Sequence, residues 1–348
     1  MSLLVSFYLM PILIKVADKF KLYDVPNERK IHSAFISSLG GVGIYFSVMI
    51  GLFVSRLLEP DQHFDSSFYF ILLGMIVIFI NGLGDDLFGY TAKQKFFIQF
   101  AICFAFIDSK GAIQIYFEEL FNSYLLSRVF LSIGLVAVIN SVNLLDGIDG
   151  LAASIGIFIT FVFFVLNVLH GNYPLTILSV SLLGALGGFL YFNFNPAKIF
   201  MGDSGSLLLG FIIALLAIST PYRNYSISIY YTKLHVISLI LSVLAFPIFE
   251  VVRLFFTRIM SGKSPFIGDR NHLHHILVDK GFNQRGAVLV LLLINFLFVV
   301  SAMTVFQLPI VLLLTLEFLG YLAFVFLLKR SSVLSSSSGM LTKIRDKD

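Results

Sequence analysis

Eleven stretches of mainly apolar residues, most of them close to the length that crosses a lipid bilayer, make up the greater part of this chain. A membrane-spanning helix needs about 20 such residues. Apolar residues are 58% of the sequence and charged residues 13%, and a water-soluble fold could not hide that much apolar surface behind so few charges. The sequence therefore predicts an all-α, polytopic membrane protein with helices at about 1–16, 40–58, 67–84, 96–112, 126–142, 151–169, 174–192, 205–220, 234–254, 287–306 and 309–328.

Lysine and arginine are distributed unequally between the segments that connect these helices. Of the 24 such residues, 19 fall on one side of the predicted membrane and five on the other. Because positively charged loops stay in the cytoplasm, we expect that side to be cytoplasmic, with the N-terminus outside and the C-terminus inside. This distribution also accounts for the net charge of +4, so the basicity gives no reason to expect a nucleic-acid partner.

The connecting segments are too short for a separate water-soluble domain. We expect one transmembrane domain over residues 1–330 and a serine-rich, disordered cytoplasmic tail over 331–348. The cytoplasmic loops are predicted at 15–39, 85–95, 140–150, 193–204 and 253–286.

Five aspartates lie at the cytoplasmic ends of predicted helices, in three glycine-flanked segments. They are Asp85, Asp86, Asp146, Asp149 and Asp203. Each could cap a helix or form a turn, but a carboxylate within a membrane costs about 2.5–3.5 kcal/mol, so five on one side favour a function. Adjacent carboxylates repel each other unless a cation lies between them. Mg²⁺ takes one or two carboxylates together with water and phosphate oxygens, which favours a site for phosphoryl transfer.

A histidine-rich segment lies in the last cytoplasmic loop. His272, His274 and His275 occur within four residues, shortly after Arg270. Such a segment fits either a zinc site or a site that binds pyrophosphate oxygens through charge-assisted hydrogen bonds. The lack of a partnering cysteine and the number of hard carboxylates favour pyrophosphate. A further basic set that includes Lys30 and His32 fits either substrate or lipid headgroups.

Taken together, these motifs resemble the polyprenyl-phosphate N-acetylhexosamine-1-phosphate transferases, which form glycosyltransferase family 4. The motifs follow the family's order, with membrane helices between them. They are Asp24–His32 with Gly40-Gly41, Gly84-Asp85-Asp86, Asn140–Ala152, Gly188–Leu207 and the loop that ends in His272-Leu-His274-His275.

The histidine motif separates two branches of this family. Asp269-Arg-Asn-His-Leu-His-His275 is similar to the sequence of the undecaprenyl-phosphate GlcNAc-1-phosphate transferases. The phospho-MurNAc-pentapeptide translocases, which have a Pro-x-His-His-His type of sequence, are the alternative within the family.

The resemblance implies a reaction at the cytoplasmic face of the bacterial cytoplasmic (inner) membrane. Undecaprenyl phosphate and a UDP-N-acetylhexosamine, first of all UDP-GlcNAc, would give undecaprenyl-diphospho-sugar and UMP. This would be the first membrane step of cell-surface polysaccharide assembly, such as that of lipopolysaccharide O-antigen or cell-wall polymers. The implied cofactor is Mg²⁺, with Mn²⁺ as a second candidate, and a homodimer is left open.

The resemblance also implies roles for the acidic residues and the histidines. Asp203 would bind Mg²⁺, and Asp146 would act as a second metal ligand or as a catalytic carboxylate. Asp85 and Asp86 would lie near the carrier phosphate, with Asp85 as the base. A phosphate monoester with a second pKa near 6 is largely dianionic at neutral pH, however, so the chemistry itself favours metal binding and positioning over proton abstraction. His272, His274 and His275 would contact the pyrophosphate or the sugar.

The remaining implied site residues bind the nucleotide sugar or the phosphates. Phe200 would stack on the uracil ring. The others are Lys30, His32, Asn143, Asp149, Asn193 and Arg270.

An ion-coupled transporter is the alternative from a different class of protein, because intramembrane carboxylates also mark ion paths. A transporter gathers its ionisable groups near the membrane midplane. Here they are predicted at one end of the helices, with the histidines and Arg270 in a loop, which favours the enzyme.

Overall fold

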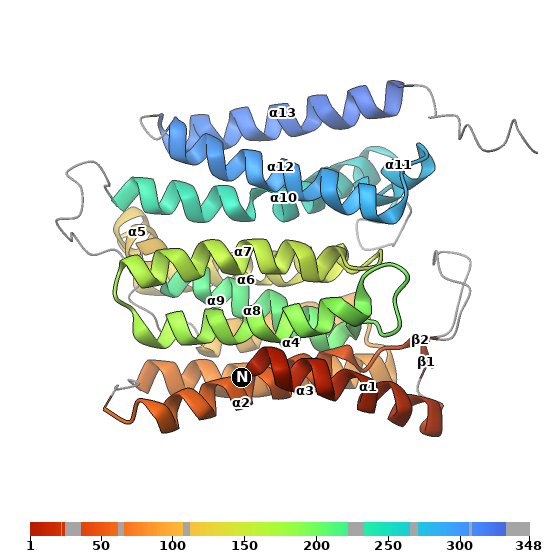
Figure 1. The fold of residues 1–348 in the computed structure, drawn as a ribbon. Coiled ribbons are helices and arrows are strands. Elements are labelled where there is room, and N and C mark those ends of the chain that lie inside the picture. The colour runs from red at the N-terminus through yellow and green to blue at the C-terminus, as the bar shows by residue number, and fades with distance from the viewer. Residues whose placement is uncertain are drawn as a thin grey trace, which may run out of the picture.

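The computed structural model is a helical bundle, and its described part comprises residues 1–21, 23–24, 36–61, 66–106, 112–221, 233–264, 271–305 and 308–331. The helices lie roughly side by side, from α1–α3 at one edge of the molecule to α12 and α13 at the opposite edge (Figure 1). This confirms the predicted all-α class. One pair of two-residue antiparallel strands, β1 with β2, is the exception among the described elements.

The elements, in chain order, are α1 (Ser2–Phe20), β1 (Tyr23–Asp24), β2 (Ile36–Ser37), α2 (Gly40–Leu58), α3 (Ser66–Phe88), α4 (Ala92–Phe106), α5 (Ala112–Phe121), α6 (Tyr124–Leu145), α7 (Leu151–Leu169), α8 (Tyr173–Asn193), α9 (Gly202–Ser219), α10 (Lys233–Met260), α11 (Leu273–Asp279), α12 (Gln284–Thr304) and α13 (Ile310–Arg330).

Nine helices of the described part are long and apolar enough to cross a membrane, namely α2, α3, α6, α7, α8, α9, α10, α12 and α13. The first predicted span corresponds to α1, which carries Lys15, Asp18 and Lys19, and the fourth corresponds to α4, which has 15 residues. The helices establish a polytopic membrane protein. The count of eleven spans and their orientation stay predictions.

Several helices continue beyond the ends that hydropathy predicts. The apolar runs end at about 84 and 142, whereas α3 continues to Phe88 and α6 to Leu145. Hydropathy marks where a helix becomes polar, which is not where its backbone hydrogen bonds stop. Asp85 and Asp86 therefore lie in the last turn of α3, and only residues 89–91 connect α3 to α4. The short helices α5 and α11 are not among the predicted elements.

The centre of the bundle is α9, in which every residue from Ser204 to Ile218 is buried. It packs against α2, α3, α6 and α7. The approach of α2 is close because a Cβ on Gly41 would overlap the backbone nitrogen of Gly205. Gly202 begins α9 with a φ of +71°, a left-handed conformation that favours glycine. The N-terminal turn of α9 is thereby fixed beside α2 and α3.

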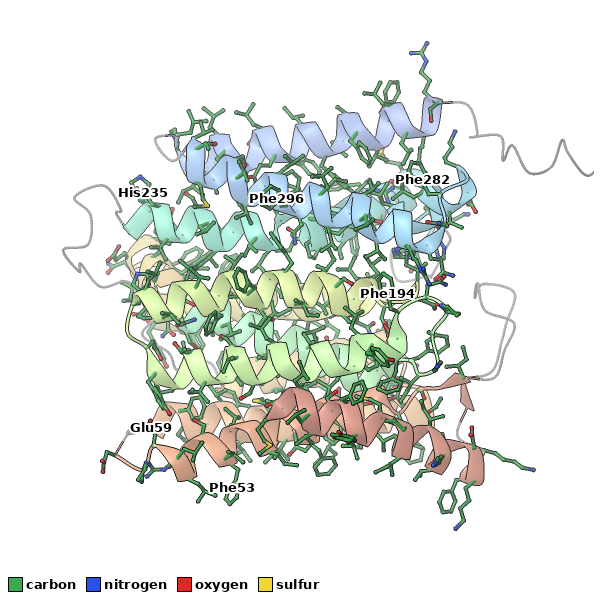
Figure 2. All side chains as sticks on the ribbon, in the orientation of Figure 1. Phe53, Glu59, Phe194, His235, Phe282 and Phe296 are labelled. Atoms are coloured by element: carbon green, nitrogen blue, oxygen red, sulfur yellow. The ribbon has the colours of Figure 1, made fainter. Side chains whose placement is uncertain are left out.

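The segments that carry the sequence motifs lie at one end of the bundle. The α6–α7 and α8–α9 connections and the helix α11 all lie at this end (Figure 1). Phe194 and Phe282 mark it, whereas Glu59 and His235 lie at the opposite end (Figure 2). Motifs that are far apart in the sequence thus share one polar end.

Candidate active site

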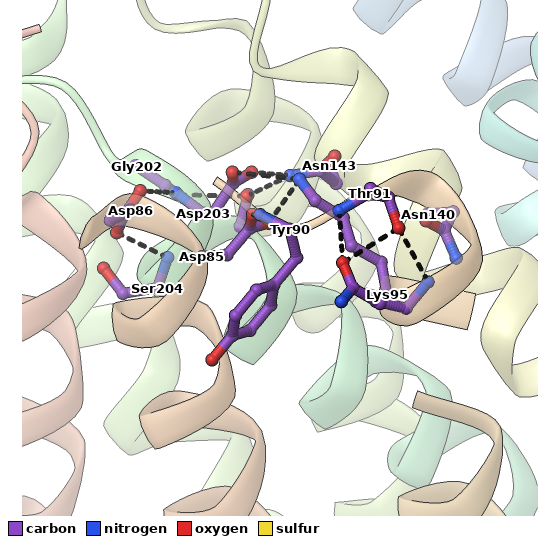
Figure 3. Close-up of polar contacts among 12 residues, drawn as sticks. Asp85, Asp86, Tyr90, Thr91, Lys95, Asn140, Asn143, Gly202, Asp203 and Ser204 are labelled. Carbon is purple, nitrogen blue, oxygen red and sulfur yellow. Dashed lines mark hydrogen bonds and ion pairs between the residues drawn. The ribbon is translucent and has the colours of Figure 1, made fainter. Parts of the chain in front are cut away.

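Acidic and amide side chains from three helices meet at this end of the bundle. Asp85 and Asp86 come from the last turn of α3, Asn143 from the last turn of α6 and Asp203 from the first turn of α9 (Figure 3). We call these four residues, three aspartates and one asparagine, the carboxylate cluster. The structure thus brings together residues from three separate sequence motifs.

Asp86 caps the N-terminus of α9. Its Oδ1 accepts a hydrogen bond from the backbone N–H of Asp203 (2.7 Å), and its Oδ2 accepts one from the N–H of Ser204 (3.0 Å) (Figure 3). These donors have no partner within the helix, and a negative charge is favourable at a helix N-terminus. Asp86 therefore positions Asp203, although α3 and α9 are far apart in sequence.

Lys95, in the first turn of α4, lies between two of the carboxylates. Its Nζ forms an ion pair with Asp85 Oδ2 and lies 3.2 Å from Asp203 Oδ2 (Figure 3). Asp85 Oδ1 also accepts a hydrogen bond from the backbone N–H of Tyr90 (2.8 Å). Partial burial lowers the pKa of Lys95, but Asp203 and Asp85 outweigh it and raise the pKa above its ordinary value. Lys95 therefore carries a positive charge between Asp85 and Asp203.

Asn143 contacts Asp203 directly. Its Nδ2 donates hydrogen bonds to Asp203 Oδ1 (2.6 Å) and to Ser206 Oγ (2.8 Å). The predicted nucleotide-sugar role of Asn143 stays a prediction. Three residues therefore bind different atoms of Asp203. Asn143 binds Oδ1, Lys95 binds Oδ2 and Asp86 binds the backbone N–H.

Asp149 and Asn193 hold the loop between α8 and α9. Asp149 Oδ2 accepts hydrogen bonds from Asn195 Nδ2 (2.9 Å) and from the backbone N–H of Ala197 (3.0 Å). Asn193 is buried, accepts from the N–H of Gly150 (3.0 Å) and donates to the carbonyl of Ile199 (2.8 Å). Both side chains, predicted to bind substrate, thus already bind backbone groups, and their role toward a nucleotide sugar stays a prediction.

Asp146 and Phe200, which are also predicted site residues, lie in the α6–α7 and α8–α9 connections. Asp146 is the C-cap of α6 and is half-buried. Phe200 is half-buried, and its backbone is fixed because its N–H donates to Ser37 of β2 (2.7 Å) and its carbonyl accepts from Gly40 (3.0 Å). Lys30, His32 and Arg270 lie outside the described residues.

His272, His274 and His275 form a buried group at the start of α11, and we call them the histidine cluster. The ring centroids of His274 and His275 are 4.3 Å apart, and those of His272 and His274 are 5.2 Å apart. A Cβ on Gly147 would overlap His274 Nε2, so this ring lies against the α6–α7 connection. Burial, and then the neighbouring His275, His272 and Arg253, lower the pKa of His274 well below its ordinary value, so this imidazole is neutral.

The donor groups at this end suit a hard cation that is shared with substrate. Within the described residues, no group of three or more His, Cys, Asp or Glu side chains converges as a complete metal cage, which gives no support to a zinc site at the histidines. Mg²⁺ does not need such a cage, because one or two carboxylates suffice when phosphate oxygens and water complete its coordination. The side chain of Asp203 is 30% exposed and can supply such a ligand.

Comparisons with known proteins show the family of this chain. Residues 68–221 match the family model described as glycosyl transferase family 4. The chain is 31% identical, over 86% of its length and 82% of the relative's, to a Bacillus subtilis protein named as a probable undecaprenyl-phosphate N-acetylglucosaminyl 1-phosphate transferase. The chain belongs to glycosyl transferase family 4.

Two further relatives carry similar names. An Escherichia coli (strain K12) undecaprenyl-phosphate alpha-N-acetylglucosaminyl 1-phosphate transferase is 30% identical over 80% of this chain and 75% of its own length. A Mycobacterium leprae decaprenyl-phosphate N-acetylglucosaminephosphotransferase is 31% identical over 80% of this chain and 75% of its own length. The part that matches the family-4 model contains the whole carboxylate cluster and ends before α10.

Sequence reasoning missed Lys95, which it counted only as a positive charge in a loop. A signal was present, because Lys95 follows the Asp85-Asp86 pair by about ten residues at the start of the next helix. The short connection between α3 and α4 forms a helical hairpin, which returns the start of α4 to the end of α3. The buried Glu250 and Arg253 of α10 were also missed.

Proposed function

We propose that this protein transfers GlcNAc-1-phosphate from UDP-GlcNAc to undecaprenyl phosphate, giving undecaprenyl-diphospho-GlcNAc and UMP. The observation that carries the proposal is the position of Lys95 between Asp85 and Asp203 at the polar end of a membrane-embedded bundle. Such an arrangement suits phosphates that are attached to a lipid. The names of the relatives support the substrate class.

In this reaction, an oxygen of the carrier phosphate attacks the donor phosphorus that bears the sugar. The bond from this phosphorus to the bridging oxygen breaks, and UMP leaves with that oxygen. Because the attacking phosphate is largely dianionic at neutral pH, no side chain has to remove a proton from it. The main tasks of the protein are to align the two phosphates and to balance their charge.

The described residues divide these tasks. Lys95 supplies a fixed positive charge next to Asp85 and Asp203. Asp86 and Asn143 fix Asp203. Mg²⁺, held by Asp203 with Asp146 as a candidate second ligand, would neutralise phosphate charge when bound. The histidine cluster, which lies next to Gly147, is proposed to contact the pyrophosphate or the sugar of the donor.

An exchange assay with purified protein tests this function. Labelled UMP should be incorporated into UDP-GlcNAc only when undecaprenyl phosphate and Mg²⁺ are both present, because the reverse reaction needs the lipid-linked product. Exchange that persists in excess EDTA would count against the metal. Exchange without lipid phosphate would count against the acceptor.

The active site is proposed to face the cytoplasm, where UDP-sugars are found, in the bacterial inner membrane. Single cysteines that replace the exposed residues Asp61 and Ser261 test this orientation. The native Cys103 is buried, so its background labelling is low. An impermeant maleimide added to intact cells should label the cysteine at position 61 and spare the one at 261. The opposite pattern would reverse the orientation.

A further inference from the structure

A buried ion pair lies in α10, outside the carboxylate cluster. The residues Glu250 and Arg253 are 2% and 6% exposed. Arg253 Nη2 lies 2.9 Å from Glu250 Oε1 and 3.0 Å from Oε2, and Arg253 Nε lies 3.2 Å from Oε2. Ion pairs of this kind do not in themselves favour the folded state, because the cost of desolvating both charges can exceed their attraction. The other bonds of this pair indicate what it does.

Both members of the pair bind the backbone next to His272. Glu250 Oε1 accepts a hydrogen bond from the N–H of Leu273 (2.7 Å), and Arg253 Nη2 donates one to the carbonyl of Asn271 (2.7 Å). The two bonded groups lie immediately before and after His272. The main chain of this residue is therefore held on both sides by one charged pair.

A tyrosine from the C-terminal helix completes the arrangement. The hydroxyl of Tyr321, in α13, donates a hydrogen bond to Glu250 Oε2 and accepts one from Arg253 Nε (3.0 Å). Tyr321 is 1% exposed. The group thus joins α10 and α13 to the segment that begins α11.

We infer that Glu250 and Arg253, which both form hydrogen bonds with Tyr321, are positioning residues. They set the backbone of residues 271–273 and thereby place the histidine cluster against Gly147 and the donor substrate. The inference rests on the proposed function. A fixed main chain at His272 determines where α11 begins, and the ring of His274 then lies against the α6–α7 connection. The histidines are expected to contact the nucleotide sugar. A change in Glu250 or Arg253 should therefore alter the kinetics with UDP-GlcNAc and not those with undecaprenyl phosphate.

Glu250→Gln tests this role. Both carboxylate oxygens of Glu250 accept hydrogen bonds, so one side of a glutamine amide would place its NH₂ against a donor, and Arg253 would lose its counter-charge. The matched control is Glu317→Gln. Glu317 is also a buried glutamate in the same group of helices, but it accepts hydrogen bonds from Ser242 (2.8 Å) and Ser301 (2.6 Å), away from the histidines.

Two measurements are made on each purified full-length variant. The first is amide hydrogen exchange of the peptide over residues 271–279, which needs no catalysis. The second is steady-state kinetics, which gives kcat and the KM for UDP-GlcNAc and, separately, the KM for undecaprenyl phosphate. Glu250→Gln should speed exchange in this peptide and lower kcat/KM for UDP-GlcNAc by about tenfold or more, the scale of a lost hydrogen bond to a charged group. The KM for undecaprenyl phosphate and all Glu317→Gln values should match the wild type.

Other outcomes are equally clear. Equal effects of Glu250→Gln and Glu317→Gln, or equal losses toward both substrates, would overturn the positioning role. If Glu250→Gln does not fold, Tyr321→Phe is used instead, because it removes a single hydroxyl from the group. This variant should give the same pattern to a smaller extent. Unchanged hydrogen exchange and unchanged kinetics in Tyr321→Phe would overturn the positioning role. A wild type without transferase activity would instead contradict the proposed function, and the exchange measurement would still decide whether the pair holds the backbone.

Discussion

The carboxylate of Asp86 accepts hydrogen bonds from the backbone N–H groups of Asp203 and Ser204, in the first turn of α9. One of the two adjacent aspartates of α3 is thus occupied as a cap, while the other forms the ion pair with Lys95. Two neighbouring residues that look equivalent in the sequence therefore have different tasks. Asp86 holds the first turn of α9 in place, and Asp85 pairs with the positive charge of Lys95.

Replacing the cap at Asp86 should reduce activity beyond any loss of stability. Asp86→Ala removes both acceptors, so the first turn of α9 and the side chain of Asp203 are released. The matched control is Asn172→Ala, because Asn172 caps α8 through the N–H of Leu175 (3.1 Å). Either change should lower stability by about 0.5–2 kcal/mol. Thermal unfolding in detergent and transfer rates should show that only Asp86→Ala loses activity, and equal activity of the two variants would contradict the positioning of Asp203 by Asp86.

Asp203→Asn separates metal binding from a structural role. Asparagine keeps the size of aspartate and one of its two side-chain oxygens, but it removes the charge that a hard cation needs and places an NH₂ against either Asn143 or Lys95. We expect a folded, membrane-inserted protein whose activity is about 10²-fold lower, the scale of losing one important electrostatic group. Partial recovery at higher Mg²⁺ or with Mn²⁺ would support the metal. Activity like that of the wild type at equal protein level would remove Asp203 from the site.

Lys95→Gln should have a similarly large effect. The substitution leaves Asp85 and Asp203 close together without the charge that separates them, and it removes a cation from the phosphate site. We expect kcat/KM to fall by about 10²-fold. Lys93→Gln is the control, because Lys93 is exposed on the same helix and carries the same charge. If both variants lose activity equally, the effect comes from net charge and not from the ion pairs.

A large part of this architecture could be predicted from the sequence, because long apolar runs leave few other folds available. The helices α2 and α7 begin and end where their apolar runs do. The sequence could not show that Asp86 caps α9, since this depends on how α3 packs against α9. Lys95 was missed for a different reason, because the short turn between α3 and α4 places it beside Asp85 and its spacing from the Asp85-Asp86 pair was overlooked.

The buried histidine cluster should make stability depend on pH. Burial, and then the neighbouring His275, His272 and Arg253, hold the pKa of His274 well below its ordinary value of 6.5, whereas the unfolded chain takes up a proton near that value. The unfolded state therefore binds more protons as the pH falls below about 6.5, and the free energy of unfolding decreases. Unfolding measurements across this range should show the decrease, with a smaller slope for His274→Asn. An identical slope in the variant would assign the dependence to other groups.

The most direct measurement follows both parts of the transferred group. UDP-GlcNAc is prepared with one label in the sugar and a second in the phosphate that bears the sugar, and it is incubated with purified protein, undecaprenyl phosphate and Mg²⁺. Transfer of GlcNAc-1-phosphate predicts that both labels enter the lipid in equal amounts and that UMP is released. Entry of the sugar label alone with release of UDP, or no entry of either label, would contradict the proposed function.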